Sequence, residues 1–539
     1  MNSLRKITSC NKLSVKLLIY VFFIVLHIFL FNINAAEWGD SYKILKAAEY
    51  IKRLDYPKNE KRPPLFSIIL ATRPQPVDAV VWGRVVMLAF SLTSFFCFDK
   101  LVSQYIKKDK YQNISLILFT LNPVYLYWSI RIMSDIPFSF FVILTFYLLS
   151  RWKGALSVSR SILLGFILGL AILTRFEGYI LLFSVMVGMI FMESGLKLSF
   201  FLPRVFFREL WYKLKYLVPL GLTTLIVILP YWLFRSPIDS KYLDEQEYRS
   251  FDFSLLWIYF VSLLYILGFI PFFYFVIKDI FSHKSSGSVI IFLRENVGIS
   301  VFLLLECILI LWWPAAVPRL FVAVVPFFII VFVRSYEDFE TQDTKLSLLD
   351  ILALSFLLLF YGVSQYYMRL QFLLPVKTVF VAVFLMQLVV IVSIIKKKSN
   401  IMLIFGLLSI FIWSLATIWL HRYLYLSIRD AAKYAAYNLS GKVIYNDVSS
   451  ISDWYITQSG INKNIKGDFH AVLNLDDINY KILRKKNPDY LILTNEYNPY
   501  INFGIERRPY LTLVKEFKYN INGKVFFSDI LKFNKELGQ

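Results

Sequence analysis

Long apolar segments alternate with short polar ones along the chain up to about residue 420. A helix needs about 20 residues to cross the hydrocarbon core of a membrane, and fewer when the polar residues at its ends reach the surface. Windows of this kind lie at 15–35, 79–98, 113–130, 135–150, 161–174, 178–192, 216–234, 255–277, 297–313, 320–333, 347–363, 376–395 and 401–420. The pattern therefore predicts about thirteen transmembrane helices.

Beyond Arg429 the pattern changes to that of a small α/β domain. It predicts strands at 442–445, 490–493, 511–517 and 525–533, and an amphipathic helix at 476–486. Asn522-Gly523 is typical of a hairpin turn between the last two strands. We therefore expect a membrane domain, residues 1–428, followed by a soluble α/β domain, residues 429–539. No motif in the second domain indicates chemistry, so we expect an accessory or acceptor-positioning role for it.

Composition supports a polytopic, α-helical membrane protein. Hydrophobic residues make up 58% of the 539 residues, and 51 residues are phenylalanine. A soluble core cannot bury so much apolar surface. The net charge is +21, but the basic residues lie between apolar segments as orientation signals do, so nucleic-acid binding is not expected. The three cysteines lie in or beside apolar segments, which excludes a disulfide framework and a Cys metal cluster.

The distribution of Lys and Arg over the short loops orients the chain. With the N-terminus in the cytoplasm, the inner loops hold most of the basic residues and the outer short loops hold few. The first apolar segment is long for a signal peptide, so an uncleaved first helix is favoured over a cleaved signal ending near Ala35-Ala36. An odd number of helices then places the C-terminal domain on the extracytoplasmic side, and the cell membrane is the expected location.

The outer loop at residues 35–78 departs from this charge distribution. Its basic residues are Lys43, Lys46, Lys52, Arg53, Lys58, Lys61, Arg62 and Arg73. Translocation of longer segments depends less on charge, but an outer loop that stays basic favours an anionic ligand. The loop is also the only long polar interruption among the N-terminal apolar segments. We therefore expect the chemistry of the protein to lie here.

Acidic residues at the outer ends of the predicted helices are candidates for function, because ionisable groups are costly at membrane depth. Glu37 and Asp40 follow the first helix and share one face of a helical turn. One of them could instead cap the helix expected to start near Ser41. Asp135 opens the fourth apolar segment, where Asp135 or Ser134 could equally be a simple N-cap.

Three arginines in outer turns complete the set. Arg62 precedes Pro63-Pro64, which stiffen the backbone and hold the guanidinium near the membrane surface, where it suits a phosphate. Arg319 lies in a second turn bracketed by prolines, and Arg175 lies beside Glu177 in a very short turn. Two simpler readings stay open: Arg62 as a lipid anchor, and Arg175 as half of a structural ion pair.

Together these features resemble the GT-C class of integral membrane glycosyltransferases. More narrowly, they resemble the polyprenyl-phosphate-sugar-dependent enzymes of the protein O-mannosyltransferase and aminoarabinose transferase kind, the glycosyltransferase family 39 group. The resemblance extends over nearly the whole chain and is carried by Glu37-Trp38-Gly39-Asp40, Arg62-Pro63-Pro64-Leu65, Asp135, Thr174-Arg175 and Pro318-Arg319-Leu320-Phe321. There are two departures. Arg62 stands where Lys is more usual, and the two acids, adjacent in some members, are separated here.

The resemblance implies transfer of a hexose or pentose from a polyprenyl-phosphate donor to a lipid, glycan or protein acceptor, with inversion at the anomeric carbon. Such a displacement needs a carboxylate that accepts the proton of the nucleophile. We expect Asp40 to be this base, with Glu37 as the second choice. The donor's tail would lie along the apolar helices.

The remaining residues fit the donor. A fixed guanidinium offsets the negative charge that grows on the leaving phosphate, and Arg62, Arg319 and Arg175 are the expected phosphate-binding residues. Asp135 would bind sugar hydroxyls or a divalent cation that bridges to the phosphate. No acidic or His cluster demands a metal, so a divalent cation stays possible and no cofactor is certain.

Two other classes explain part of the pattern. A lipid-linked-saccharide flippase or transporter accounts for the helices and the basic outer surface, but it predicts midplane charges or broken helices at matched positions in two halves. Arg84 is the only arginine inside an apolar segment, and no repeat at matched spacing is present. A polysaccharide polymerase also has arginines in outer loops, but it does not need an acidic loop directly after the first helix.

Overall fold

The structure, a computed structural model, describes most of the chain. The described residues are 2–57, 60–192, 203–234, 270–281, 287–313, 317–341, 346–367, 377–458, 460–470, 478–496, 501–521 and 523–536, together with Leu256, Tyr259 and Leu263. Five expected features lie partly outside this set: Lys58 and Asn59 of the loop at 35–78, most of the first part of the 255–277 window, Val376 of the 376–395 window, residues 476 and 477 of the predicted helix, and Asn522 of the hairpin turn.

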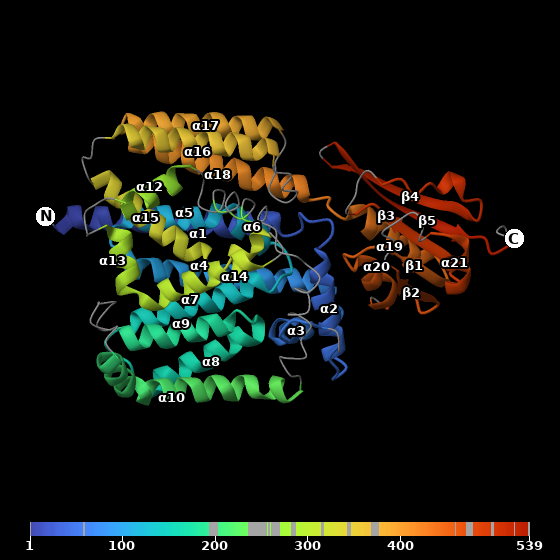
Figure 1. The fold of residues 1–539 in the computed structure, drawn as a ribbon, viewed down its shortest axis with the longest axis horizontal. Coiled ribbons are helices and arrows are strands. Elements are labelled where there is room, and N and C mark those ends of the chain that lie inside the picture. Colours follow the sequence, from blue (N-terminus) through green and yellow to red (C-terminus); the bar gives the residue numbers. More distant parts are fainter. Residues whose placement is uncertain are drawn as a thin grey trace.

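The described residues up to His421 form a bundle of mostly apolar helices. Figure 1 shows its long helices side by side, with the N-terminus at one end and the C-terminal region beyond the other. The helices are α1 (Asn2–Leu30), α4 (Ala79–Tyr105), α5 (Asp109–Leu121), α6 (Pro123–Ser129), α7 (Asp135–Arg151), α8 (Val158–Thr174), α9 (Gly178–Phe191), α10 (Pro203–Phe234), α12 (Ile270–Phe281), α13 (Ser288–Glu295), α14 (Val297–Trp312), α15 (Val325–Thr341), α16 (Leu348–Tyr367), α17 (Lys377–Ile395) and α18 (Ser399–His421).

Each predicted window is mainly helical wherever the chain is described, but the number of spans stays a prediction. The helix of the first window ends at Leu30, and the window at 320–333 is α-helical only from Val325 on. Among the described residues, four helices are long and apolar enough to cross a membrane: Ala79–Tyr105, Phe207–Phe234, Thr378–Ile395 and Ser399–Asn438. A fifth span results if α13 and α14, which meet at a bend of 99°, are counted as one. Four further apolar helical segments have only 10–17 residues: Val15–Leu30, Val158–Thr174, Gly178–Phe191 and Leu348–Val363.

The window at 113–130 is two helices rather than one. Asn122 ends α5, and its side chain accepts hydrogen bonds from the backbone N–H groups of Val124 and Tyr125, which caps α6. Pro123 occupies the first position of α6, where its missing N–H costs nothing. The break places α6, with its buried aromatic residues, against the turn η4 (Pro318–Phe321).

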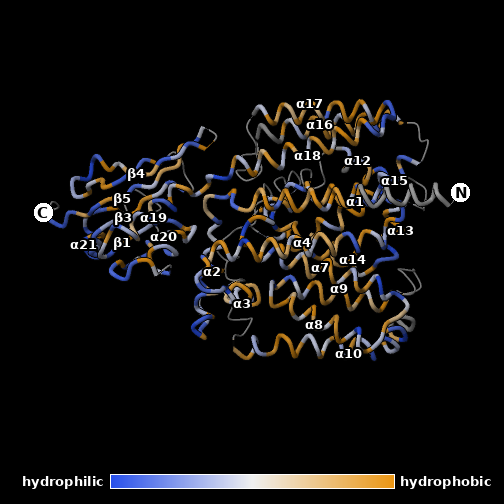
Figure 2. The backbone as a smooth tube through the Cα atoms, turned by 180° about the vertical axis from the view of Figure 1, so that it is seen from behind, coloured by the Kyte–Doolittle hydropathy of each residue, from blue (hydrophilic) through white to orange (hydrophobic). Residues whose placement is uncertain are grey.

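Two further helices lie between α1 and α4, at the end of the bundle that faces the C-terminal region: α2 (Gly39–Ile51) and α3 (Leu65–Ala71). Figure 2 shows that α2 carries many hydrophilic positions, in contrast to the apolar bundle helices. The helix begins at Gly39 rather than near Ser41. Its N-cap residue is Trp38, and no side chain caps it. Neither Glu37 nor Asp40 therefore acts as the cap.

The C-terminal region forms one five-stranded sheet in the order β2-β1-β3-β5-β4. Strand β1 (Gly441–Tyr445) pairs in parallel with β2 (Ile465–Phe469) and β3 (Tyr490–Thr494). Strand β5 (Lys524–Phe533) runs antiparallel to β3 and to β4 (Leu511–Ile521). Four of these strands and the helix α21 (Tyr480–Lys486) match the predictions. Sequence reasoning missed β2, because its Lys-Gly-Asp centre lacks the alternation of a half-buried strand.

The C-terminal region packs directly onto the segment that links α1 to α2. The Arg429 side chain, on α19 (Leu426–Asn438), donates a hydrogen bond of 2.6 Å to the carbonyl oxygen of Ala35. Lys46 and Asp453 form an ion pair of 2.8 Å. A Cβ atom placed on Gly39 would lie 2.6 Å from the Cα atom of Ser449, so only glycine fits there. The segment that carries Glu37 and Asp40 is therefore held between the helical bundle and the C-terminal region.

Candidate functional site

Asp40 lies in the first turn of α2 and is held between two arginines from other segments. Its Oδ1 atom lies 2.5 Å from Nη2 of Arg62, and its Oδ2 atom accepts a hydrogen bond of 2.8 Å from Nη1 of Arg319. The side chains of Asp40, Arg62 and Arg319 are 25%, 22% and 24% exposed. All three groups can therefore be reached by a ligand. We refer to these three residues as the Asp40 cluster.

The two arginines are positioned by their own surroundings. The backbone N–H and the Nη1 atom of Arg62 both contact Oε1 of Glu60, at 2.9 and 3.1 Å. The Tyr56 hydroxyl donates to the carbonyl oxygen of Arg62 at 2.7 Å. Arg319 lies in η4, and its guanidinium carbon is 5.9 Å from the centre of the Trp128 ring on α6. Glu60 and Trp128 are two supporting residues that sequence reasoning did not identify.

The charges around Asp40 determine its protonation. Burial raises the pKa of Asp40, but the positive charges of Arg62, Arg319 and Lys43 outweigh burial and hold that pKa well below its usual range. Asp40 is therefore ionised at neutral pH. While both arginines are paired with it, its basicity is low, because protonation would have to compete with two ion pairs.

A second ion-pair group joins Asp135 to the turn between α8 and α9. Nη1 of Arg175 lies 2.6 Å from Oδ1 of Asp135, and Nε of Arg175 donates to Oε1 of Glu177 at 3.0 Å. Burial raises the pKa of Glu177, but Arg175 outweighs it and lowers that pKa overall. Neither Ser134 nor Asp135 makes a side-chain cap of α7. Within the described residues, Oδ2 of Asp135 has no hydrogen-bond partner.

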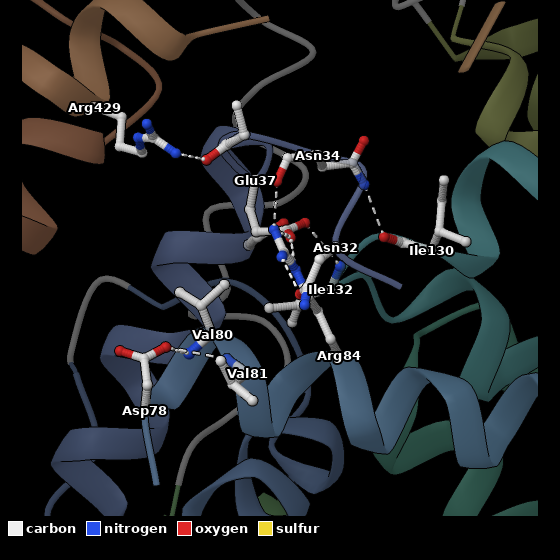
Figure 3. A network of polar contacts seen from close by, with 12 residues as sticks. Asn32, Asn34, Glu37, Asp78, Val80, Val81, Arg84, Ile130, Ile132 and Arg429 are labelled. Carbon is white, nitrogen blue, oxygen red and sulfur yellow. Dashed lines mark hydrogen bonds and ion pairs between the residues drawn. The ribbon is translucent and has the colours of Figure 1, made fainter. Parts of the chain in front are cut away.

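Glu37 belongs to a third group, shown in Figure 3. Its carboxylate has no exposed surface. Oε1 accepts a hydrogen bond of 2.8 Å from Nε of Arg84 on α4, and Oε2 accepts one of 3.3 Å from the backbone N–H of Ile132. Arg84 also donates to the side chain of Asn32 and to the carbonyl oxygen of Asn34, at 2.9 and 2.7 Å. Glu37 thus ties the end of α1 to α4 and to the loop before α7.

The path of the whole chain can be compared with solved structures. ArnT from Cupriavidus metallidurans, solved with undecaprenyl phosphate, superposes with a TM-score of 0.57 over 95% of this chain and 97% of that one. The apo form of the same protein gives a TM-score of 0.58. Identity is 11% in both cases.

The chain has the GT-C fold.

More distant GT-C structures agree. The oligosaccharyltransferase of Archaeoglobus fulgidus, solved with a tethered acceptor peptide, has a TM-score of 0.50, 11% identity and coverage of 96% of this chain and 74% of that one. The mycobacterial arabinofuranosyltransferase AftD has a TM-score of 0.50 and 12% identity, and the match covers 97% of this chain and 40% of that one. No protein-family model and no curated protein sequence matches the chain. The likeness is therefore one of fold.

On this GT-C fold the expected site residues fall into three groups. Direct contacts join Asp40, Arg62 and Arg319; Asp135 contacts Arg175; and Glu37 contacts neither set through its carboxylate. Sequence reasoning noted Arg84 only as an isolated charge and did not pair it with Glu37. The roles of all six residues stay predictions. Among the described residues, no group of three or more His, Cys, Asp and Glu side chains is arranged to hold a metal ion.

Proposed function

We propose that the chain is a membrane glycosyltransferase that moves a sugar from a polyprenyl-phosphate donor to an acceptor on the extracytoplasmic side. The observation that carries the proposal is the Asp40 cluster: one partly exposed carboxylate paired with two arginines from separate turns. Two guanidinium groups at one point match the oxygens of a phosphate. The ArnT structure of similar fold is bound to undecaprenyl phosphate, which supports the same class of donor here.

Asp40 and its arginines would exchange partners during the reaction. A donor phosphate entering the cluster competes with Asp40 for Arg62 and Arg319. As the arginines turn to the phosphate, Asp40 loses the charges that depress its pKa and becomes a stronger base. Binding of the donor thus raises the pKa of Asp40. Without the donor, Asp40 stays paired with Arg62 and Arg319.

The transfer step is a single displacement. The acceptor oxygen forms a bond to the anomeric carbon while the bond from that carbon to the phosphate oxygen breaks. The electron pair leaves with the phosphate, whose charge Arg62 and Arg319 offset, and the acceptor proton passes to Asp40. Asp135, with one oxygen on Arg175 and the other without a partner in the described part of the chain, would bind the sugar hydroxyls.

The test is sugar transfer by membranes that contain the full chain and a radiolabelled polyprenyl-phosphate sugar. We expect Asp40→Asn to lower transfer by about 10²- to 10⁴-fold, the usual contribution of a general base, with unchanged expression. Asp55→Asn is the matched control, because Asp55 is an exposed acid of the same loop, and it should transfer sugar at the wild-type rate.

Normal transfer by Asp40→Asn would remove Asp40 from the mechanism. If the wild-type chain instead moves the donor lipid across the bilayer and forms no covalent product, the glycosyltransferase proposal is wrong and the flippase alternative holds.

A further inference from the structure

Arg131 is a buried arginine in the loop between α6 and α7, and the function proposed above does not use it. Its side chain is 1% exposed. Neighbouring contacts fix the loop on both sides, as Figure 3 shows. The Asn34 amide donates 2.9 Å to the carbonyl oxygen of Ile130, and the N–H of Ile132 donates to Glu37. The position of Arg131 is therefore set by the backbone, independently of what its side chain binds.

The guanidinium of Arg131 has no hydrogen-bond partner within the described residues, at Nε, Nη1 or Nη2. A buried polar group without a partner destabilises the folded protein, and a charged one does so more strongly. The Tyr127 and Trp38 ring centres lie 4.5 and 5.9 Å from the guanidinium carbon. Rings of this kind attract the face of the cation, but they leave the N–H donors unused. The three nitrogens of this buried cation thus have no partner at hydrogen-bond distance among the described residues, although the Tyr127 hydroxyl interacts with the guanidinium.

Arg131 lies next to the Asp40 cluster. Trp38, which contacts Arg131, directly precedes Gly39-Asp40 in the chain. The Ser41 hydroxyl, one residue beyond Asp40, lies 3.7 Å from the sulfur of Met133 in the same loop as Arg131. The loop that carries Arg131 is therefore packed against the start of α2.

Arg131 and Arg319 each contact one ring of an aromatic pair, Trp38 and Trp128. The ring centres of Trp38 and Trp128 are 5.5 Å apart. Trp38 contacts Arg131, and Trp128 contacts Arg319. The two cations therefore contact different rings of this pair. They differ in charge balance as well, because Arg319 is paired with Asp40, whereas no acid forms a salt bridge with Arg131 in the described part of the chain.

We propose that Arg131, flanked by Tyr127 and Trp38, is a second oxyanion-binding subsite, which takes a phosphate or carboxylate group of a substrate. The proposal rests on the function proposed above, because that function supplies the anionic substrates. A guanidinium offers several donors in one plane, which matches the oxygens of such a group. Trp38 is only half-buried, so the anion would enter past this side chain.

The subsite predicts a specific pattern of stability and binding. The variants are Arg131→Met, which keeps the apolar stem, and Arg131→Lys, which keeps the charge without the planar donors. Replacing a binding arginine that has no partner should leave the unfolding temperature of the free protein unchanged or higher. A structural arginine should instead lower it in both variants, and that result would overturn the proposal.

Binding is measured as the rise in unfolding temperature of the full-length protein in lipid nanodiscs. One titration uses undecaprenyl phosphate and the other uses inorganic phosphate. We expect Arg131→Met to weaken the apparent affinity at least tenfold and Arg131→Lys to weaken it less. Arg53→Met is the matched control, because Arg53 is an exposed arginine of the loop at 35–78, and its affinity should equal that of the wild type.

The two titrations distinguish the source of the anion. Weaker binding of undecaprenyl phosphate assigns the subsite to the donor lipid, whose single phosphate would then lie at Arg131 rather than in the Asp40 cluster. Weaker binding of inorganic phosphate alone assigns it to a free or acceptor-borne oxyanion. If Arg131→Met binds both probes like the wild type, or if the wild type binds neither, the subsite is wrong. Sugar transfer is measured separately. If the wild type transfers sugar, the proposed function holds even when the binding results rule out the subsite.

Discussion

Glu37 and Asp40 are three residues apart, yet their carboxylates lie in opposite surroundings. Glu37 has no exposed surface, and both its oxygens accept hydrogen bonds from groups that hold the fold together. Asp40 is a quarter exposed, and its partners are two cations that an anionic ligand can also bind. Two acids in one short segment are therefore not interchangeable candidates. The partners of each carboxylate separate a structural role from a catalytic one.

The strongest test of this contrast is Glu37→Gln. The change leaves Arg84 buried without its carboxylate, and breaking a buried ion pair in this way costs about 3 to 5 kcal/mol. We expect a clear fall in the unfolding temperature, and a loss of transfer only in proportion to the protein lost. Glu49→Gln, which breaks the more exposed pair with Arg73, should cost far less. A stable but inactive Glu37→Gln protein would instead make Glu37 the base.

Removing one arginine of the Asp40 cluster should affect catalysis more than folding. We expect Arg319→Gln to lower kcat/KM for the donor by about 10²- to 10³-fold, the usual effect of losing one electrostatic contact to a developing negative charge. Arg319→Lys should recover part of the loss because it keeps the charge. The measurement is steady-state transfer at fixed acceptor. Equal rates in all three proteins would show that Arg319 does not contact the phosphate.

The acid limb of the pH profile reports on the pairing of Asp40. The base must be ionised, so the rate falls as the pH falls through its pKa. In the free enzyme the two arginines lower that pKa, which places the acid limb of kcat/KM well below pH 4. Once the arginines bind the donor, the pKa rises, so the acid limb of kcat should lie at higher pH.

Arg319→Gln sharpens this measurement. It removes one of the charges that lower the pKa of Asp40, so the limb of kcat/KM should move to higher pH and approach that of kcat. If the acid limbs of kcat and kcat/KM coincide in the wild type, the proposal that the arginines move from Asp40 to the donor phosphate is wrong. The same depressed pKa contributes to folding stability at pH values above about 4, and this contribution is lost as the pH falls through the folded-state value.

The smallest effect is expected at the ion pair between Lys46 and Asp453, which are 30% and 25% exposed. Such pairs contribute about 0 to 1 kcal/mol. Lys46→Asp should lower the unfolding temperature slightly, and the double variant with Asp453→Lys should recover it. The rate of sugar transfer should also fall slightly in Lys46→Asp and recover in the double variant, because this contact joins α2 to the C-terminal region. Full activity in the single variant would show that the pair does not help to position Asp40.

Much of this architecture could be predicted from the sequence, because apolar windows and alternating strands depend on local pattern. The break in the window at 113–130 also had a local signal, Asn122-Pro123, which is a favoured start of a helix. The strand β2 had none. Strand β2 forms by pairing with β1, and its Lys-Gly-Asp centre does not by itself indicate a strand.

The candidate site could be predicted only in part. Asp40 stood out as an acid directly after the first helix, and Arg62 and Arg319 stood out by residue type and by neighbouring prolines. That they contact one another depends on how three distant segments pack, and no local pattern encodes such a distance. The pairing of Glu37 with Arg84 and the burial of Arg131 were hidden for the same reason. In each case the informative quantity was the partner of a charge, which appears only in three dimensions.

The contact between Gly39 and Ser449 limits how this protein could be re-engineered. An exchange of C-terminal regions between related enzymes would normally cut the chain at the connector before α19. Here the backbone at Ser449 also forms the surface on which the start of α2 rests. A graft that keeps the connector but changes the turn around Ser449 would leave Asp40 misplaced, so the exchangeable unit must include that turn.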